Sequence, residues 1–300
     1  MVSSRGLGDV YKRQPIMRER LPPVRRWCIM GAMHLFSFPV SVTGVLTACA
    51  LALGGCASVE PGASAGGVEK LRAVVKERYP FDSASFTQGL EVAADGTLLV
   101  GTGQEGQSRI YRRSLENADA ELASVDLDPE FFGEGITQVG DSVWQLTWQD
   151  GVALRRDTDT LEETDRATYD GEGWGLCARQ DELIFSDGSA ELRRLDPETF
   201  AERERFTVTA NGAPVAGLNE LECVGDAVYA NIFTTTDIVR IDAATGEVSA
   251  IIDASALPNN AEDDPNNVLN GIAHLPDTDE FLLTGKRWPD MYRVTFEPAE

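Results

Sequence analysis

The stretch "FGEGITQVGDSVWQLTW", residues 132–148, contains the pattern that decides the fold. A small loop with one carboxylate, Glu134, between two glycines leads into an apolar segment, a Gly-Asp turn and a second apolar segment that alternates with polar residues. Alternation of β-branched and aromatic residues is typical of strands, and Gly and Asp are typical of the turns between them. The stretch therefore predicts a β-hairpin that begins with an acid in an apolar setting.

Four other segments repeat this pattern along the chain. They read "FTQGLEVAADGTLLVGTG" (86–103), "GEGWGLCARQDELIFSDG" (171–188), "GLNELECVGDAVYANIF" (217–233) and "VLNGIAHLPDTDEFLLTGK" (268–286). The aligned anchor positions, Gln88, Glu134, Trp174, Asn219 and Asn270, are separated by 46, 40, 45 and 51 residues. Periods of about 40 to 50 residues with about four strands each are typical of propeller blades. We therefore predict an all-β fold, a five-bladed β-propeller.

The last repeat ends too close to the end of the sequence to have an outer strand of its own. The N-terminal segment "VEKLRAVVKERY" (68–79) is strand-like and could supply that strand. Such closure would remove a free sheet edge, which is a site of unwanted pairing. We therefore expect residues 68–300 to form one propeller domain whose ring is closed by the N-terminal strand.

In a propeller the innermost strands surround a central channel, and the loops that enter them meet at one end. The five anchors should therefore converge there. A second aligned column should lie beside them and consists of Gly103, Trp148, Gly188, Phe233 and Lys286. Apolar walls with a few inward polar groups are typical of small-molecule sites, so the two columns predict a pocket.

The N-terminal region has the features of an export signal. Residues 1–16 resemble translated adapter sequence, and residues 17–55 contain a basic stretch followed by a mostly apolar one. The ending "LALGGC" resembles the lipobox of bacterial lipoproteins, which implies cleavage before Cys56 and a lipid on its thiol. The alternative is an uncleaved membrane helix.

On the lipoprotein interpretation, residues 56–67 are a flexible tether, because the segment is small and polar. The protein is then expected in the cell envelope or periplasm, where it touches the membrane only through the lipid. Ala57 after the cysteine favours the outer membrane by resemblance to enteric sorting rules.

Charge and rare residues exclude several classes of function. Residues 1–55 carry seven of the 26 basic and two of the 49 acidic side chains, so the rest has a net charge near −28. Nucleic acids and anionic membrane surfaces are poor partners for such a chain. Only His274 lies beyond the signal, so a multi-histidine zinc site cannot form and a His-based triad would have to use His274. Cys177 and Cys223 could form one disulfide or remain buried thiols.

The order of short motifs resembles a known enzyme family. "SFTQGLE", "FGEGIT", "WQLTW", "GEGWGL", "LNELE", "VLNGIA" and "LTGKRWPDMYRV" are similar to the motifs of plant-type glutaminyl-peptide cyclotransferases, which also occur in bacteria. The similarity spans about residues 75–296. It implies a five-bladed propeller that converts the N-terminal glutamine of peptides or proteins to pyroglutamate and releases ammonia. We expect a monomer, and the chemistry requires no metal or other cofactor.

The resemblance also assigns roles to individual residues. Glu134 is the general acid/base, and Lys286 acts beside it as a polar group that binds substrate and can supply a donor to the oxyanion. The substrate-binding residues are Gln88, Asn219, Phe86, Phe132, Trp148 and Trp174. Phe233 stands where the family usually has tryptophan, so its contact with substrate lacks an indole N–H.

The chemistry agrees with these roles. One carboxylate can take a proton from the attacking amine and pass it to the departing nitrogen, and burial should raise its pKa while Lys286 lowers it. Other interpretations stay open: Glu134 could be structural, and Glu172 is a weaker second acid. Glu134, Asn219 and Asn270 could hold Ca²⁺ as in a propeller lactonase, or the domain could be a scaffold without catalysis.

Overall fold

The computed structural model describes residues 67–115 and 120–299, and every regular element in them is a β-strand. The all-β class is thereby confirmed. The predictions for residues 1–66, which include the adapter, the signal, the Cys56 lipid and the tether, lie outside the described residues. Within the described part, no helix is long and apolar enough to cross a membrane.

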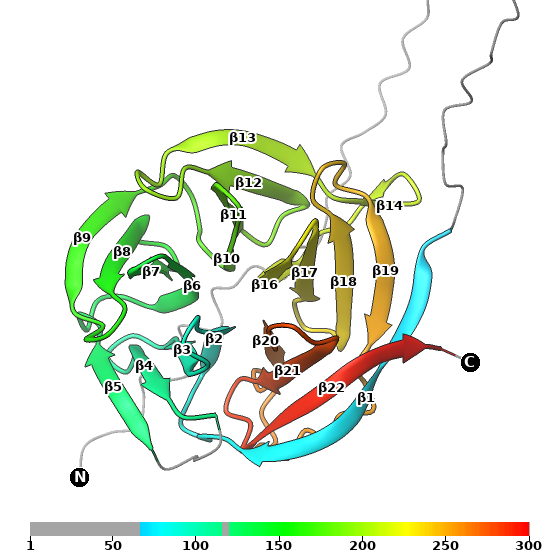
Figure 1. Cartoon of the computed structure of the whole chain (residues 1–300), viewed down its shortest axis with the longest axis horizontal. Helices are drawn as coiled ribbons and strands as arrows, with labels where there is room; N and C mark the ends of the chain where they lie inside the picture. Colours follow the sequence, from blue (N-terminus) through cyan, green and yellow to red (C-terminus); the bar gives the residue numbers. More distant parts are fainter. Residues whose placement is uncertain (1–66, 116–119, 300) are drawn as a thin grey trace, which may run out of the picture. The chain divides into compact units, whose positions relative to one another are not determined.

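Three four-stranded antiparallel sheets follow one another along the chain, each with its strands in sequence order (Figure 1). The first sheet contains β2 (Thr87–Val92), β3 (Leu98–Thr102), β4 (Arg109–Arg113) and β5 (Glu121–Asp126). The second contains β6 (Gly133–Val139), β7 (Ser142–Thr147), β8 (Val152–Asp157) and β9 (Glu163–Thr168). The third contains β10 (Leu176–Arg179), β11 (Glu182–Ser186), β12 (Glu191–Leu195) and β13 (Glu202–Thr207).

An eight-stranded sheet completes the arrangement, in the order β16-β17-β18-β19-β1-β22-β21-β20. Its first half contains β16 (Leu218–Val224), β17 (Ala227–Ile232), β18 (Asp237–Asp242) and β19 (Val248–Asp253). Its second half contains β20 (Leu269–His274), β21 (Glu280–Gly285), β22 (Asp290–Pro298) and the N-terminal β1 (Glu69–Pro80). β1 pairs antiparallel with β22 and parallel with β19, and a small hairpin of β14 (Thr209–Ala210) and β15 (Ala213–Pro214) lies outside these sheets.

The turn before the fourth strand is built from the same residue types in three of these units. Asp157, Asp196 and Asp242 each accept hydrogen bonds from the two backbone N–H groups and the threonine hydroxyl that follow. This is the turn chemistry for which Asp is favoured. The residue four positions after each aspartate has a positive φ: Leu161, Phe200 and Gly246. The short Asp-x-x-Thr motif therefore fixes where the outermost strand begins.

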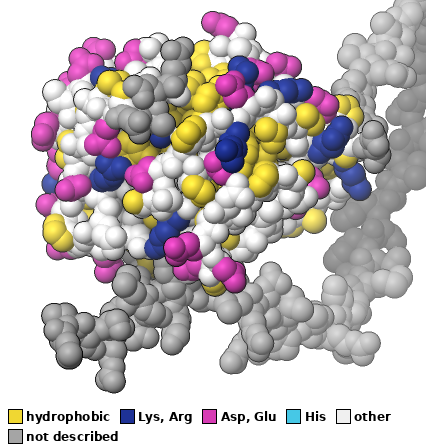
Figure 2. Space-filling model, turned by 90° about the horizontal axis from the view of Figure 1, so that it is seen from below, with side chains coloured by type: hydrophobic (Ala, Val, Ile, Leu, Met, Phe, Trp, Pro, Cys, Tyr) yellow, Lys and Arg dark blue, Asp and Glu magenta, His cyan; other side chains and the backbone are white. Residues whose placement is uncertain are grey.

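The core lies between neighbouring sheets rather than inside one. Trp144, for example, is 2% exposed, and its ring lies 4.8 Å from that of Phe200 on the next sheet's turn. Trp144 therefore packs between two neighbouring sheets. On the face shown in Figure 2, Asp and Glu side chains lie among Lys and Arg, with apolar side chains between them.

The first strand of each four-stranded unit has one edge that is not paired within its own sheet. Side chains on the first strands of neighbouring units accept hydrogen bonds from backbone N–H groups on that edge. These strands contact one another in the order β2, β6, β10, β16, β20 and back to β2. Unpaired edge N–H groups need acceptors when buried. Glu220 on β16 accepts the N–H groups of Leu90 on β2 (3.2 Å) and Ile272 on β20 (2.8 Å). Carboxylates on inner strands thus replace backbone acceptors.

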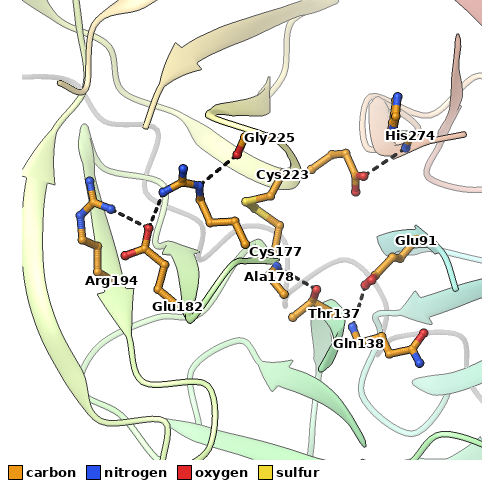
Figure 3. The surroundings of a disulfide bond; sticks show 12 residues. Glu91, Thr137, Gln138, Cys177, Ala178, Glu182, Arg194, Cys223, Gly225 and His274 are labelled. Carbon is orange, nitrogen blue, oxygen red and sulfur yellow. Dashed lines mark hydrogen bonds and ion pairs between the residues drawn. A yellow bond between two sulfur atoms is a disulfide. The ribbon is translucent and has the colours of Figure 1, made fainter. Parts of the chain in front are cut away.

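Further cross-links follow beyond Glu220 (Figure 3). Glu91 accepts the backbone N–H of Gln138 at 2.9 Å, and Glu222 accepts that of His274 at 3.2 Å. The Thr137 hydroxyl accepts the N–H of Ala178 at 3.0 Å. Between β10 and β16 the connection is covalent, because Cys177 and Cys223 form a disulfide with Cα atoms 5.5 Å apart. The sequence left this pairing open, and the structure decides for the disulfide.

Candidate active site

Register shifts place the predicted anchors at one end of the inner strands. In β2, β6, β16 and β20 the pairing with the next strand slips directly after the first paired residue. The first residue in each of these slips is a predicted anchor: Gln88, Glu134, Asn219 and Asn270. Such bulges re-aim side chains and are frequent at active sites. Trp174 lies two residues before β10, and its backbone N–H donates to Ser186.

Glu134 is buried, with 5% of its surface exposed. Its Oε1 accepts a hydrogen bond from Gln88 Nε2 at 3.0 Å, whereas Oε2 accepts none from the described residues. Gln88 is fixed in turn, because its Oε1 accepts a hydrogen bond from Asn270 Nδ2 at 3.1 Å. Gln88 therefore holds one oxygen of Glu134, and its second N–H is left for the substrate contact that was predicted, which stays a prediction.

Lys286 is also buried, with 3% exposed, directly after β21. Its Nζ lies 4.9 Å from the centre of the Phe86 ring and 5.2 Å from that of Phe233. The Nζ atom has no hydrogen bond or ion pair within the described part of the chain, whereas the backbone N–H donates to the Val268 carbonyl. Two aromatic faces are a favourable setting for a cation that is removed from water.

The two charges influence each other without a direct ion pair. Burial raises the pKa of Glu134 well above its usual value, and the positive charge of Lys286 opposes that rise. Burial lowers the pKa of Lys286 to about 8, although the charge of Glu134 acts in the other direction. The pKa of the carboxyl group is thus raised and that of the ammonium group lowered, which is typical of groups that move protons.

Five rings form what we call the aromatic wall: Phe86, Phe132, Trp148, Trp174 and Phe233. Edge-to-face contacts join the first three, with centroids 6.1 Å and 5.6 Å apart, and the last two, with centroids 5.2 Å apart. Lys286 bridges the wall between Phe86 and Phe233. The predicted pocket residues thus come together, although they belong to four different sheet units.

Glycines at the ends of two strands make room for this wall. A Cβ at Gly103 would lie 2.3 Å from the Phe132 ring, and one at Gly188 would lie 2.7 Å from the Trp174 indole. No real Cβ tolerates such distances without a shift of its neighbour. The two glycines of the predicted second column therefore leave space for the rings rather than lining the pocket with side chains.

Asn219 is 2% exposed, and its side-chain amide has no hydrogen-bond partner in residues 67–115 or 120–299. Its backbone carbonyl accepts a hydrogen bond from the Ser186 hydroxyl at 2.6 Å, which fixes the strand next to Trp174. An amide that the protein leaves unpaired can donate to or accept from a ligand or water. Asn219 therefore remains a predicted substrate contact.

The residues of the alternative cation site are arranged differently from an oxygen cage. Asn270 points its Nδ2, a donor, at Thr87 O (2.9 Å) and at Gln88. No group of three or more His, Cys, Asp or Glu side chains in the described residues is placed to hold a metal ion. Two nearby acids, Glu220 and Glu222, accept backbone N–H groups of neighbouring inner strands.

Two residues near the aromatic wall could hardly be predicted as site residues from the sequence. Glu172, which the sequence offered only as a weaker second acid, accepts hydrogen bonds from both tryptophans of the wall. The Arg287 guanidinium lies 4.7 Å from the centre of the Phe86 ring and donates to Gln104 at 2.9 Å. The motif "GKRW" contains Arg287, but only its neighbour Lys286 matched the aligned column.

Buried Glu134 and Lys286, together with the aromatic wall, form a candidate enzyme site on an all-β scaffold. Residues 47–296 match the glutamine cyclotransferase family, and the chain belongs to that family. It is 32% identical over 229 residues to glutaminyl-peptide cyclotransferase of Arabidopsis thaliana, covering 75% of this chain and 71% of that protein. The crystal structure of Myxococcus xanthus glutaminyl cyclase superposes with a TM-score of 0.73 at 35% identity, covering 78% of this chain and all of that one.

Proposed function

We propose that this chain cyclises the N-terminal glutamine of peptides or proteins to pyroglutamate and releases ammonia. The observation that carries the proposal is Glu134, which has one oxygen held by Gln88 and the other open, opposite a buried cation. The family to which the chain belongs is named for the same reaction. A glutaminyl side chain has the size and polarity for a pocket with an aromatic wall and few polar groups.

The reaction needs one proton carrier. The neutral α-amine attacks the side-chain carboxamide carbon and forms the ring C–N bond, while Glu134 Oε2 accepts a proton from the attacking nitrogen. The tetrahedral intermediate carries a negative oxygen, to which Lys286 and the Asn219 amide can donate. Glu134 then returns the proton to the former amide nitrogen, the old C–N bond breaks, and ammonia leaves.

The aromatic wall makes a second contribution to the rate, by holding the substrate in the reactive conformation. In free solution a glutaminyl residue seldom places its amine against its own carboxamide, whereas a pocket that holds the chain folded makes this the populated conformer. Exclusion of water also strengthens the interaction of Lys286 with the developing oxyanion.

The scaffold is best understood as a five-bladed propeller. Three sheets and the two halves of the eight-stranded sheet each contain four strands in meander order, with β1 as the outer strand beside β22. The parallel contact of β1 with β19 joins two adjacent blades. On this proposal the N-terminal strand closes the ring.

The location of the protein is a separate proposal that rests on residues 17–56. A basic start, an apolar stretch and "LALGGC" support export and a lipid on Cys56, with the domain held as a monomer in the cell envelope. Mass spectrometry of the membrane fraction tests it, because a lipid adduct must appear on the peptide that begins at Cys56.

The function is tested by ammonia release from a glutamine-initiated dipeptide. The wild-type protein should turn over, Glu134→Gln should lose at least a hundredfold in kcat, and Glu162→Gln, an exposed acid on the β8–β9 turn, should match wild type. A chelator should leave the rate unchanged. No turnover by wild type, or full activity of Glu134→Gln, would contradict the proposal, and loss on chelation would favour the lactonase-like alternative.

A further inference from the structure

The aromatic wall has a gap between its two tryptophans, and Glu172 fills it. No ring contact joins Trp148 to Trp174 among the described residues; instead both indoles donate to one oxygen. Glu172 Oε2 accepts Trp148 Nε1 at 2.9 Å and Trp174 Nε1 at 3.0 Å. An indole N–H can only donate, so a shared acceptor fixes the direction of both rings. Because Lys286 contacts Phe86 and Phe233, the five rings, Glu172 and Lys286 together form a continuous ring of contacts.

Glu172 is itself firmly held. Its other oxygen accepts Gln149 Nε2 at 2.8 Å, and its loop is tied to the same strand end, because Gly173 N–H donates to the Trp148 carbonyl at 2.9 Å. Hydrogen bonds to a charged acceptor are stronger than neutral ones, which makes a carboxylate the suitable group at a shared point. The side chain is partly exposed, so it stands at the rim and not at the reacting atoms.

We propose that Glu172 is a positioning residue of the cyclisation, which sets the angle between the two indoles that hold the glutaminyl side chain folded. The inference rests on the proposed function. A displacement of about 1 Å in a pocket that selects one conformer can cost about a hundredfold in rate, which is the size of effect available to such a residue. The same charge also raises the pKa of Glu134, and so it opposes Lys286.

Two variants separate positioning from charge. Glu172→Gln keeps an oxygen that can accept both indole N–H groups but removes the negative charge. Glu172→Ala removes both. We expect Glu172→Ala to lower kcat/KM tenfold to a hundredfold. Glu172→Gln should stay within about threefold of wild type at its optimum, with the acid limb of its pH profile shifted to lower pH.

A second measurement does not depend on turnover. Near-ultraviolet circular dichroism reports the asymmetric packing of aromatic rings, so Glu172→Ala should change the tryptophan signal while Glu172→Gln preserves it and far-ultraviolet spectra of both match wild type. Glu162→Ala, an exposed acid outside the site, is the control. Wild-type kcat/KM and an unchanged tryptophan signal in Glu172→Ala would overturn the inference. So would equal losses in the two variants, since charge alone would then explain them. An inactive wild-type protein would instead refute the proposed function.

Discussion

Removal of the disulfide between Cys177 and Cys223 should weaken the fold but not the chemistry. The bond closes a loop with a sequence separation of 46 residues. The chain-entropy relation gives about 4 kcal/mol of stabilisation for a loop of that length at 25 °C. For a domain of this size, that corresponds to a fall in Tm of about 10 °C.

The assay is thermal and urea unfolding of wild type and of Cys177→Ser/Cys223→Ser, each with and without dithiothreitol. Wild type should lose about 4 kcal/mol when reduced, and the double variant should not respond to the reductant. The difference between the two responses measures the stability that the disulfide contributes, separately from the cost of burying the two serine hydroxyl groups in the variant. Alkylation and mass spectrometry confirm that both thiols are free in the reduced sample.

Activity of the reduced protein at 25 °C should stay within about twofold of the oxidised protein. The two cysteines lie three and four residues beyond Trp174 and Asn219, at a level where other inner strands are joined by hydrogen bonds only. Equal Tm values for oxidised and fully reduced wild type would refute the reasoning. A selective loss of activity without loss of stability would show that the bond shapes the pocket.

Three other changes test the site and its electrostatics. Gly188→Ala should lower kcat/KM at least tenfold, because its Cβ would meet the Trp174 indole. Gly96→Ala has a similar positive φ but open space around the Cβ, so it should lower only the stability, through backbone strain. Steady-state kinetics and Tm measurements of both variants test this difference. Lys286→Met should move the acid limb of the kcat/KM profile to higher pH and abolish an alkaline limb near pH 8, which a pH series would show. Burial raises the pKa of Glu91 to about 7, above its value in the unfolded chain, so the stability that Glu91 contributes is present below about pH 4.5 and is lost as the pH rises to 7. Urea unfolding should therefore show Glu91→Gln to be more stable than wild type at pH 8 but not at pH 4.5.

Much of the site could be predicted because it repeats with the fold. Gln88, Glu134, Asn219 and Asn270 occupy the same register slip in four units, so aligning the repeats placed them at one end of the inner strands. The all-β class follows from the same alternation and turn residues. Such positions are visible in sequence because backbone pairing alone determines them.

What could not be predicted depends on side-chain contacts between units. Glu172 matters through the indoles of Trp148 and Trp174, and its position relative to the anchors made it only a weak second acid. The disulfide stayed open because the separation of Cys177 from Cys223 depends on how two adjacent sheets meet. The link from Asn270 through Gln88 to Glu134 could not be predicted either, since nothing in the motif around Gln88 shows that Asn270 holds its carbonyl.

Burial and a raised pKa do not by themselves distinguish the working acid from the structural ones. Burial raises the pKa of Glu220 well above its usual value, as it does for Glu134. Both oxygens of Glu220, however, accept backbone N–H groups, so a proton received there would have to displace a bond that joins three inner strands. Glu134 has only one oxygen held, by a side chain that is itself fixed. On the proposed function, the open oxygen is therefore the feature that suits Glu134 to proton transfer, whereas Glu220 joins the inner strands.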